Sequence, residues 1–358
     1  MKIYTDIFQR IVSLESLLDA WDEFKKGKRN KYDVQLFERH LGDNLFELHE
    51  NLISKQYHHG AYSSFYIRDP KIRLIHKSMV RDRIVHHAVF KTLNEIFEPT
   101  FIFDSYSCRK CKGTHRGVER LRVFVERTQR LHGKCFVLKC DIRKFFHSIN
   151  HAILLHIIAK RIKDADTLWL IKVLIESFSS EEQSQERERE RERVRGAPIG
   201  NLTSQLFANV YLNELDQFIK HKLRVKYYIR YSDDFVIVHN DSEYLVQIKS
   251  AIKKFLCSKL KLKLHPDKVS LRKYRQGIDF LGYVALPHAR MLRTKTKKRM
   301  VKKIRERIAE FKNGKLSEPR LLQTINSYFG VLSHANSYKF RQDITHLIWH
   351  SLKSPDNT

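Results

Sequence analysis

The run Tyr228–Val238 constrains the fold more than any other stretch, because β-prone apolar residues flank a short polar centre on both sides. Such a pattern predicts a strand, a tight turn and a second strand. The turn would carry two adjacent carboxylates, Asp233 and Asp234, at its tip. Aspartate is common in solvated turns, but neighbouring carboxylates repel each other unless a cation lies close by. The hairpin is therefore either an ordinary exposed turn or a cradle for hard divalent cations.

Another apolar run, residues 136–142, carries a single acid, Asp141, at its end. Asp141 either caps a helix that follows a strand or ends a buried strand beside the acidic hairpin. In the second case Asp141, Asp233 and Asp234 would together hold two Mg²⁺ ions. Two such ions stabilise the attacking and leaving oxygens of a phosphoryl transfer.

Four motifs follow one another along the chain, and the set is far more specific than any one of them. They are Asp141-Ile-Arg-Lys-Phe-Phe146, Gly196-Ala-Pro-Ile-Gly-Asn-Leu-Thr-Ser-Gln-Leu-Phe-Ala-Asn209, Tyr231-Ser-Asp-Asp234 and Phe280-Leu-Gly-Tyr283. In this order and spacing they resemble a reverse transcriptase, from about Arg68 to about Arg341. The resemblance implies an α+β right-hand polymerase with fingers, a palm built on a small antiparallel sheet, and a helical thumb. It also implies RNA-directed DNA polymerisation and favours the metal-binding alternative for the acids.

The second motif points to a subgroup of that family. The usual signature Gln-Gly-x-x-x-Ser-Pro appears here as Ile199-Gly-Asn-Leu-Thr-Ser-Gln205. Replacement of both end residues is typical of diversity-generating retroelements, whose reverse transcriptases copy a template RNA into cDNA with frequent errors at adenines. The resemblance therefore predicts mutagenic retrohoming. The alternatives are a group II intron-like or defence-associated reverse transcriptase and, in another functional class, a non-catalytic RNA-binding protein of the same shape.

The resemblance also assigns roles around the acids. Lys268 is expected to join Asp141, Asp233 and Asp234 as a catalytic residue by protonating the leaving pyrophosphate; the alternative is one more surface lysine. The side chains expected at the nucleotide are Lys71, Arg73, Arg109, Phe146 and Gln205. Lys71 and Arg73 would project from a finger hairpin over residues 62–74, although Lys71 equally fits a solvated surface charge.

Phe146 is expected to lie under the sugar and to clash with a 2′-hydroxyl, which selects deoxynucleotides; an ordinary core phenylalanine is the alternative. Ile199, Gly200 and Ser204 would form a template-facing loop that affects fidelity. Glutamine at position 199 would hydrogen-bond near the nascent pair, whereas isoleucine cannot. The primer grip is expected at Phe280, Leu281, Gly282 and Tyr283, with a plain hairpin core as the alternative.

The expected division is N-terminal helices and fingers over 1–135, palm over 136–285, and a basic helical thumb over 286–358. The palm would contain a charged low-complexity insertion, 179–195, with a Glu-Arg repeat at 186–193. This repeat has no apolar face, so it is expected to form a solvated loop or a frayed helix.

The charge balance independently indicates a nucleic-acid partner. Lys and Arg total 68 against 40 Asp and Glu, a formal charge of +28 with a pI near 9.9. That excess is typical of nucleic-acid binders. The alternative is a basic protein of the membrane surface, but the sequence has no amphipathic lipid-binding stretch. The expected partners are template RNA, cDNA or primer, dNTPs and, by analogy with relatives, a small basic oligomeric accessory protein. With no apolar spanning run and no leader at residue 1, the expected location is the cytoplasm.

Overall fold

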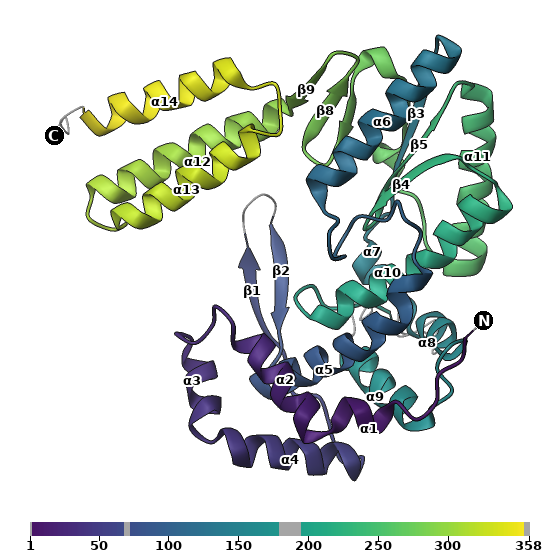
Figure 1. Cartoon of the computed structure of the whole chain (residues 1–358), viewed down its shortest axis with the longest axis vertical. Helices are drawn as coiled ribbons and strands as arrows, with labels where there is room; N and C mark the ends of the chain where they lie inside the picture. Colours follow the sequence, from purple (N-terminus) through teal and green to yellow (C-terminus); the bar gives the residue numbers. More distant parts are fainter. Residues whose placement is uncertain (1, 68–71, 179–194, 354–358) are drawn as a thin grey trace, which may run out of the picture.

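The computed structural model describes residues 2–67, 72–178 and 195–353 (Figure 1). Lys71 and the Glu-Arg repeat at 186–193 lie outside the described residues. The α-helices are α1 (Phe8–Val12), α2 (Leu14–Lys25), α3 (Tyr32–Arg39), α4 (Leu41–Ile53), α5 (Val80–Phe97), α6 (Thr114–His132), α7 (Phe145–Ser148), α8 (His151–Ala159), α9 (Ala165–Glu176), α10 (Leu202–Gln217), α11 (Ser242–Phe255), α12 (Thr294–Lys312), α13 (Glu318–Leu332) and α14 (Tyr338–Lys353). The strands are β1 (Ser63–Ile67), β2 (Arg73–Lys77), β3 (Phe136–Asp141), β4 (Tyr227–Tyr231), β5 (Asp234–His239), β6 (Ser270–Lys273), β7 (Ile278–Phe280), β8 (Tyr283–Leu286) and β9 (Ala289–Leu292).

The centre of the molecule is an antiparallel sheet with strand order β4-β5-β3-β6. Successive side chains of a strand point to opposite faces, and here both faces are covered. Leu138 and Phe235 lie in a core shared with the N-terminal helices, whereas Val137 and Val236 lie in a second core shared with α6 and the thumb helices. The sheet is thus the partition between two apolar cores, and the first core runs across the expected boundary at 135/136.

The N-terminal part of the chain is helical, as its apolar spacing predicts. Helices α1 to α5 pack together, and the β1–β2 hairpin rises from them toward the helices α12 to α14 (Figure 1). The pattern over residues 153–175 suggests one helical run, but the structure divides it into α8 and α9. Asp164 causes the break, because its carboxylate accepts from the backbone N–H of Asp166 and Thr167 at the start of α9 and so caps a new helix.

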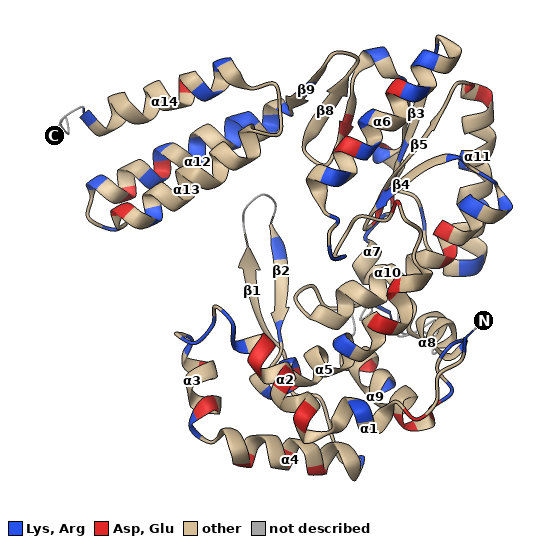
Figure 2. Cartoon of the chain, in the orientation of Figure 1, with Lys and Arg blue, Asp and Glu red and all other residues tan. Residues whose placement is uncertain are grey.

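The C-terminal part forms the basic thumb. The three-stranded sheet β7-β8-β9 connects the palm to α12, and α13 and α14 complete the helical group. One face of α12 buries Met300, Ile304 and Ile308, so its many Lys and Arg residues occupy the remaining surface (Figure 2). Over the described ranges, helices long and apolar enough to cross a membrane are absent. The N-terminal helices with their hairpin, the central sheet and the C-terminal helices together form an α+β right hand.

Candidate active site

The acidic hairpin forms as its sequence predicts. Tyr231 pairs with Asp234, which leaves Ser232 and Asp233 as the turn between β4 and β5. Ser232 adopts the left-handed region with φ 55°, which is uncommon for a residue with a side chain. The Asp233 carbonyl accepts from the backbone N–H of Ile142 at 3.3 Å, so the turn is fixed to the end of β3.

Strand register places the acids together. Asp141 and Asp234 are directly paired residues of β3 and β5, so their side chains leave the same face of the sheet. Burial raises the pKa of Asp233 to about 6, and the nearby charges of Asp141 and Asp234 add to the effect. Burial also raises the pKa of Asp234, although Lys139 opposes that rise. The cluster therefore holds negative charge that a cation would stabilise.

Two lysines partly balance this charge. The Lys268 ammonium donates to Asp141 Oδ1 at 2.9 Å, and Lys139 Nζ lies 3.8 Å from Asp234 Oδ1. Asp234 Oδ1 is nonetheless a buried atom with no hydrogen-bond partner. Within the described part of the chain, no three His, Cys, Asp or Glu side chains converge as a ready-made metal site. The donors are hard oxygens of the kind that Mg²⁺ prefers, and the orphaned Asp234 oxygen fits a group that still has to be supplied.

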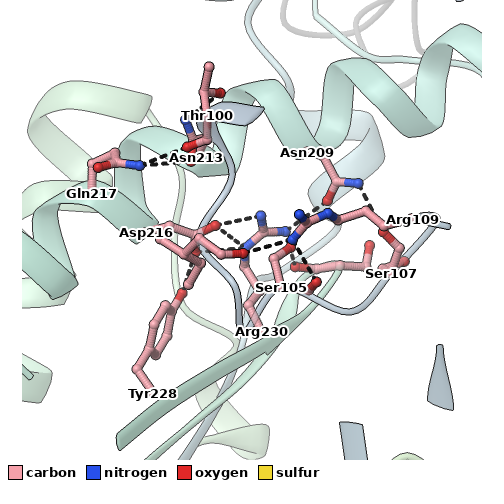
Figure 3. Close-up of polar contacts among 12 residues, drawn as sticks. Thr100, Ser105, Ser107, Arg109, Asn209, Asn213, Asp216, Gln217, Tyr228 and Arg230 are labelled. Carbon is pink, nitrogen blue, oxygen red and sulfur yellow. Dashed lines mark hydrogen bonds and ion pairs between the residues drawn. The ribbon is translucent and has the colours of Figure 1, made fainter. Parts of the chain in front are cut away.

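A buried ion pair supports the acidic turn, and sequence reasoning missed it. Arg230 on β4 and Asp216 on α10 are both fully buried, with Arg230 Nη2 2.6 Å from Asp216 Oδ2 (Figure 3). Arg230 Nη1 also donates to Asn209 Oδ1 at 3.1 Å and to the Ser232 carbonyl at 3.2 Å. The Tyr228 hydroxyl donates to Asp216 Oδ1 at 2.7 Å. The signal was present, since a charged residue within each of two apolar patterns must find a partner.

Arg109, which is expected to contact the nucleotide, instead makes its bonds within the protein. Its guanidinium is buried and pairs with Glu98, with Nη2 2.8 Å from Oε1. Nη1 donates to the carbonyls of Ile102 and Ser105 at 2.7 and 2.9 Å. These bonds hold the loop before α6 in shape, and burial explains the difference, because a guanidinium taken out of water must satisfy its donors internally. Arg109 therefore has a structural role in this loop.

The loop that carries Ile199 and Gly200 lies against the finger hairpin. The backbone N–H of His76 in β2 donates to the Ile199 carbonyl at 3.2 Å. Ser204 is buried in the first turn of α10, whereas the neighbouring Gln205 is exposed. Phe146 is half-buried, and its carbonyl accepts from the Ala197 N–H at 2.7 Å at the entry to the loop. The structure thus brings Phe146, the loop and the hairpin together, with Arg73 exposed at the start of β2.

Gly200 is required at the contact between loop and hairpin. Its φ is +141°, and a Cβ at this position would lie 2.8 Å from the His76 carbonyl oxygen. We expect Gly200→Ala to lower the free energy of unfolding by about 1–3 kcal/mol through backbone strain, and to weaken nucleotide incorporation as hairpin and loop separate. Denaturant unfolding and primer extension measure the two effects. Gly330→Ala is the control, since it lies in α13 with open space around it; equal behaviour of both variants would contradict the prediction.

The segment expected to grip the primer is a two-residue hairpin turn. Phe280 of β7 pairs with Tyr283 of β8, and Leu281 and Gly282 have φ of 51° and 90°. Positive φ at both central residues is the requirement of a type I′ turn. The Gly282 carbonyl accepts from the Arg293 N–H at 3.1 Å, just before α12 begins. The turn is therefore attached directly to the thumb, next to the palm.

Fold and site together define a polymerase of the right-hand type, with a carboxylate cluster at the centre of the palm. Residues 67–285 match the family described as "Reverse transcriptase (RNA-dependent DNA polymerase)". The match covers more than half of the 358 residues, and the chain belongs to this family of RNA-directed DNA polymerases.

Curated relatives include two bacterial proteins. Protein YkfC of Escherichia coli (strain K12) is 24% identical over 282 residues, covering 69% of this chain and 72% of YkfC. The group II intron-encoded protein LtrA of Lactococcus lactis subsp. cremoris is 25% identical over 264 residues, covering 56% of this chain and 42% of LtrA. The chain thus spans less than half the length of LtrA. Among solved structures, telomerase from Candida albicans gives a TM-score of 0.46 at 12% identity, covering 86% of this chain and 64% of that chain.

Proposed function

We propose that this reverse transcriptase copies a template RNA into cDNA with frequent errors at adenines, as in the mutagenic retrohoming of a diversity-generating retroelement. The observation that carries the proposal is the apolar Ile199 at the loop beside the finger hairpin, together with Gln205 at the start of α10. With isoleucine at this position, residue 199 has no side-chain hydrogen bond to offer the nascent base pair. Discrimination then rests on shape and base pairing alone.

Asp141, Asp233 and Asp234 would hold two Mg²⁺ ions, which stabilise charge on the transferring phosphoryl group when bound. The chain's own groups supply the rest. Lys268 Nζ lies 2.9 Å from Asp141 Oδ1 and its side chain is half-exposed, which supports the proposal that Lys268 delivers a proton to the departing pyrophosphate. Arg73, and Lys71 from outside the described residues, would bind the triphosphate oxygens. Phe280–Tyr283 would hold the primer end, and the basic surface of α12 would follow the duplex backbone.

The partners that this proposal requires are template RNA, a cDNA or primer end, and dNTPs. A small basic oligomeric accessory protein is proposed by analogy with retroelement relatives. A group II intron-like reverse transcriptase is the second candidate, favoured by the 25% identity to LtrA. The two candidates differ in the expected errors, because only the first predicts a bias at adenine.

The test of the proposed function is to copy a defined RNA, with any required accessory protein present, and to sequence the cDNA. Wild-type protein should misincorporate mainly opposite template adenines, and Ile199→Gln should lower that rate by restoring a hydrogen-bonding side chain at the loop. The other three template bases serve as internal controls. Equal accuracy at all four bases would refute the retroelement assignment while leaving reverse transcription intact.

Sugar selection gives a further prediction. Phe146 lies half-buried at the entry to the loop, and removing its bulk should admit a 2′-hydroxyl. We expect Phe146→Ala to raise incorporation of ribonucleotides relative to deoxynucleotides by roughly 10- to 100-fold, measured with single nucleotides on one primer. Phe97→Leu is the matched control, because Phe97 is buried in the core at the end of α5 and should not affect the ratio. An unchanged ratio in Phe146→Ala would make Phe146 a simple core residue.

A further inference from the structure

Asn201 stands at the N-cap of α10 but does not cap the helix. An N-cap asparagine ordinarily accepts from the backbone N–H groups of the first turn. Here the side chain turns toward the fingers instead. Asn201 Oδ1 accepts from the Ser78 hydroxyl at 3.1 Å, and Nδ2 donates to the Tyr62 hydroxyl at 3.1 Å and to His86 Nε2 at 2.8 Å. In place of a capping bond within its own helix, the Asn201 side chain makes three hydrogen bonds to residues more than a hundred positions away in the sequence.

His86 joins the same helix start a second time. Its Nδ1 lies 2.7 Å from Thr203 Oγ1. Because Nε2 accepts from Asn201, the ring proton is on Nδ1 and donates to the threonine hydroxyl. His86, Asn201 and Thr203 are all buried, and unpaired polar groups in such surroundings are strongly unfavourable. The bonds from α5 therefore fix both residues at the start of α10 in one arrangement.

The same network reaches the finger hairpin. Tyr62 precedes β1, Ser78 follows β2, and His76 within β2 donates its backbone N–H to the Ile199 carbonyl at 3.2 Å. The hairpin base and the loop are thus joined by side-chain and backbone bonds at adjacent residues, Ile199 and Asn201.

We propose that Asn201 and His86 are positioning residues, which hold Ile199 and Gly200 in register with the finger hairpin and thereby set base selection. The inference rests on the proposed placement of this loop against the templating base. The expected consequence of breaking the network is a loop that shifts relative to the hairpin. Correct nucleotides then bind less well, and the difference in KM between correct and incorrect nucleotides narrows, because a displaced loop fits the correct base pair less closely.

Asn201→Ser tests the proposal without removing a helix cap. Serine is as good an N-cap as asparagine, but its short side chain does not reach Ser78, Tyr62 and His86 together. Asn150→Ser is the matched control, because Asn150 caps α8 in the ordinary way, accepting from the Ile153 N–H at 3.0 Å. Asn201→Ser should lower the unfolding temperature, because the buried Ser78 and His86 side chains each lose a partner, whereas Asn150→Ser should unfold close to the wild-type temperature. Incorporation is therefore compared at a temperature at which both variants are fully folded, which separates positioning from stability.

Single-nucleotide incorporation opposite each of the four template bases is then measured with matched and mismatched dNTPs. For Asn201→Ser we expect KM for the matched dNTP and the mismatched-to-matched ratio each to rise about 10-fold, with little change in kcat. Asn150→Ser should match wild type. An unchanged or lower ratio in Asn201→Ser, or an equal rise in Asn150→Ser, overturns the proposal.

A second pair of variants examines His86. His86→Gln keeps one acceptor and one donor and should retain most of the wild-type ratio. His86→Leu removes the bonds from position 86 to Asn201 Nδ2 and Thr203 Oγ1 and should not retain it. Equal ratios in the two variants overturn the proposal. Because all four template bases are measured, failure of the retroelement assignment can be distinguished from failure of the positioning role. Wild-type protein that extends primers without misreading adenine refutes the retroelement assignment alone, whereas an unaltered ratio in Asn201→Ser refutes only the positioning role.

Discussion

Asp141→Asn and Asp233→Asn are each expected to reduce dNTP incorporation by about 10³-fold or more. Each substitution removes one negative charge from the cluster that would hold both metal ions, and stabilisation of several kcal/mol in the transition state depends on that charge. RNA affinity should remain close to wild type, because the basic residues of the thumb supply it. Primer extension with Mg²⁺ and a binding measurement on the same RNA separate the two quantities.

Asp267→Asn is the control for this experiment. Asp267 is exposed and directly precedes Lys268, so its substitution changes the local charge without altering the carboxylate cluster. It should extend primers at a rate near that of wild type. Near wild-type extension by purified Asp141→Asn or Asp233→Asn would remove these residues from the catalytic site.

Breaking the buried ion pair beneath the turn has the second large expected effect. Arg230→Met should lower the free energy of unfolding by about 3–5 kcal/mol, because Asp216 would remain as an uncompensated charge in the protein interior. Both side chains are fully buried, and the Tyr228 hydroxyl alone would remain on the carboxylate. Urea unfolding followed by circular dichroism measures the loss.

The double variant Arg230→Met with Asp216→Leu separates stability from catalysis. Replacing both charges by apolar side chains of similar volume should recover most of the lost stability. It cannot restore the bond from Arg230 to the Ser232 carbonyl, so the turn that carries Asp233 would lose its support and incorporation should stay low. A double variant that regains full activity would show that this bond does not position the turn.

Much of the fold follows from local patterns. The apolar, β-prone runs in Tyr228–Val238 and Phe136–Asp141 predict the strands that carry the acids, and the apolar stripe of α12 predicts a helix with a basic outer surface. These patterns work because a strand or helix repeats its geometry every two or 3.6 residues, whatever it packs against. The order of the four motifs along the chain carried the family resemblance, and the match over residues 67–285 confirms the class of enzyme.

Arg109 shows where local patterns fail. Its motif resembles a nucleotide-binding segment, yet the guanidinium is buried against Glu98. Nothing in the spacing of the sequence indicates that Glu98, at the end of α5, lies beside the loop that precedes α6. The partner of a buried charge depends on which distant segments of the chain pack together, and a single sequence does not show this.

Local sequence patterns are sufficient to predict most of the strands and helices, the acids at the ends of β3 and β4–β5, and the basic thumb, because these features depend on periodicity and composition. The tertiary structure, in contrast, sets which polar groups meet. It paired Arg230 with Asp216, turned Asn201 away from its own helix toward His86, and placed the carbonyl of His76 so close to position 200 that a side chain there would clash. Such contacts join separate elements, and burial makes each of them specific, because a polar group removed from water is stabilised only by the partner that the fold supplies.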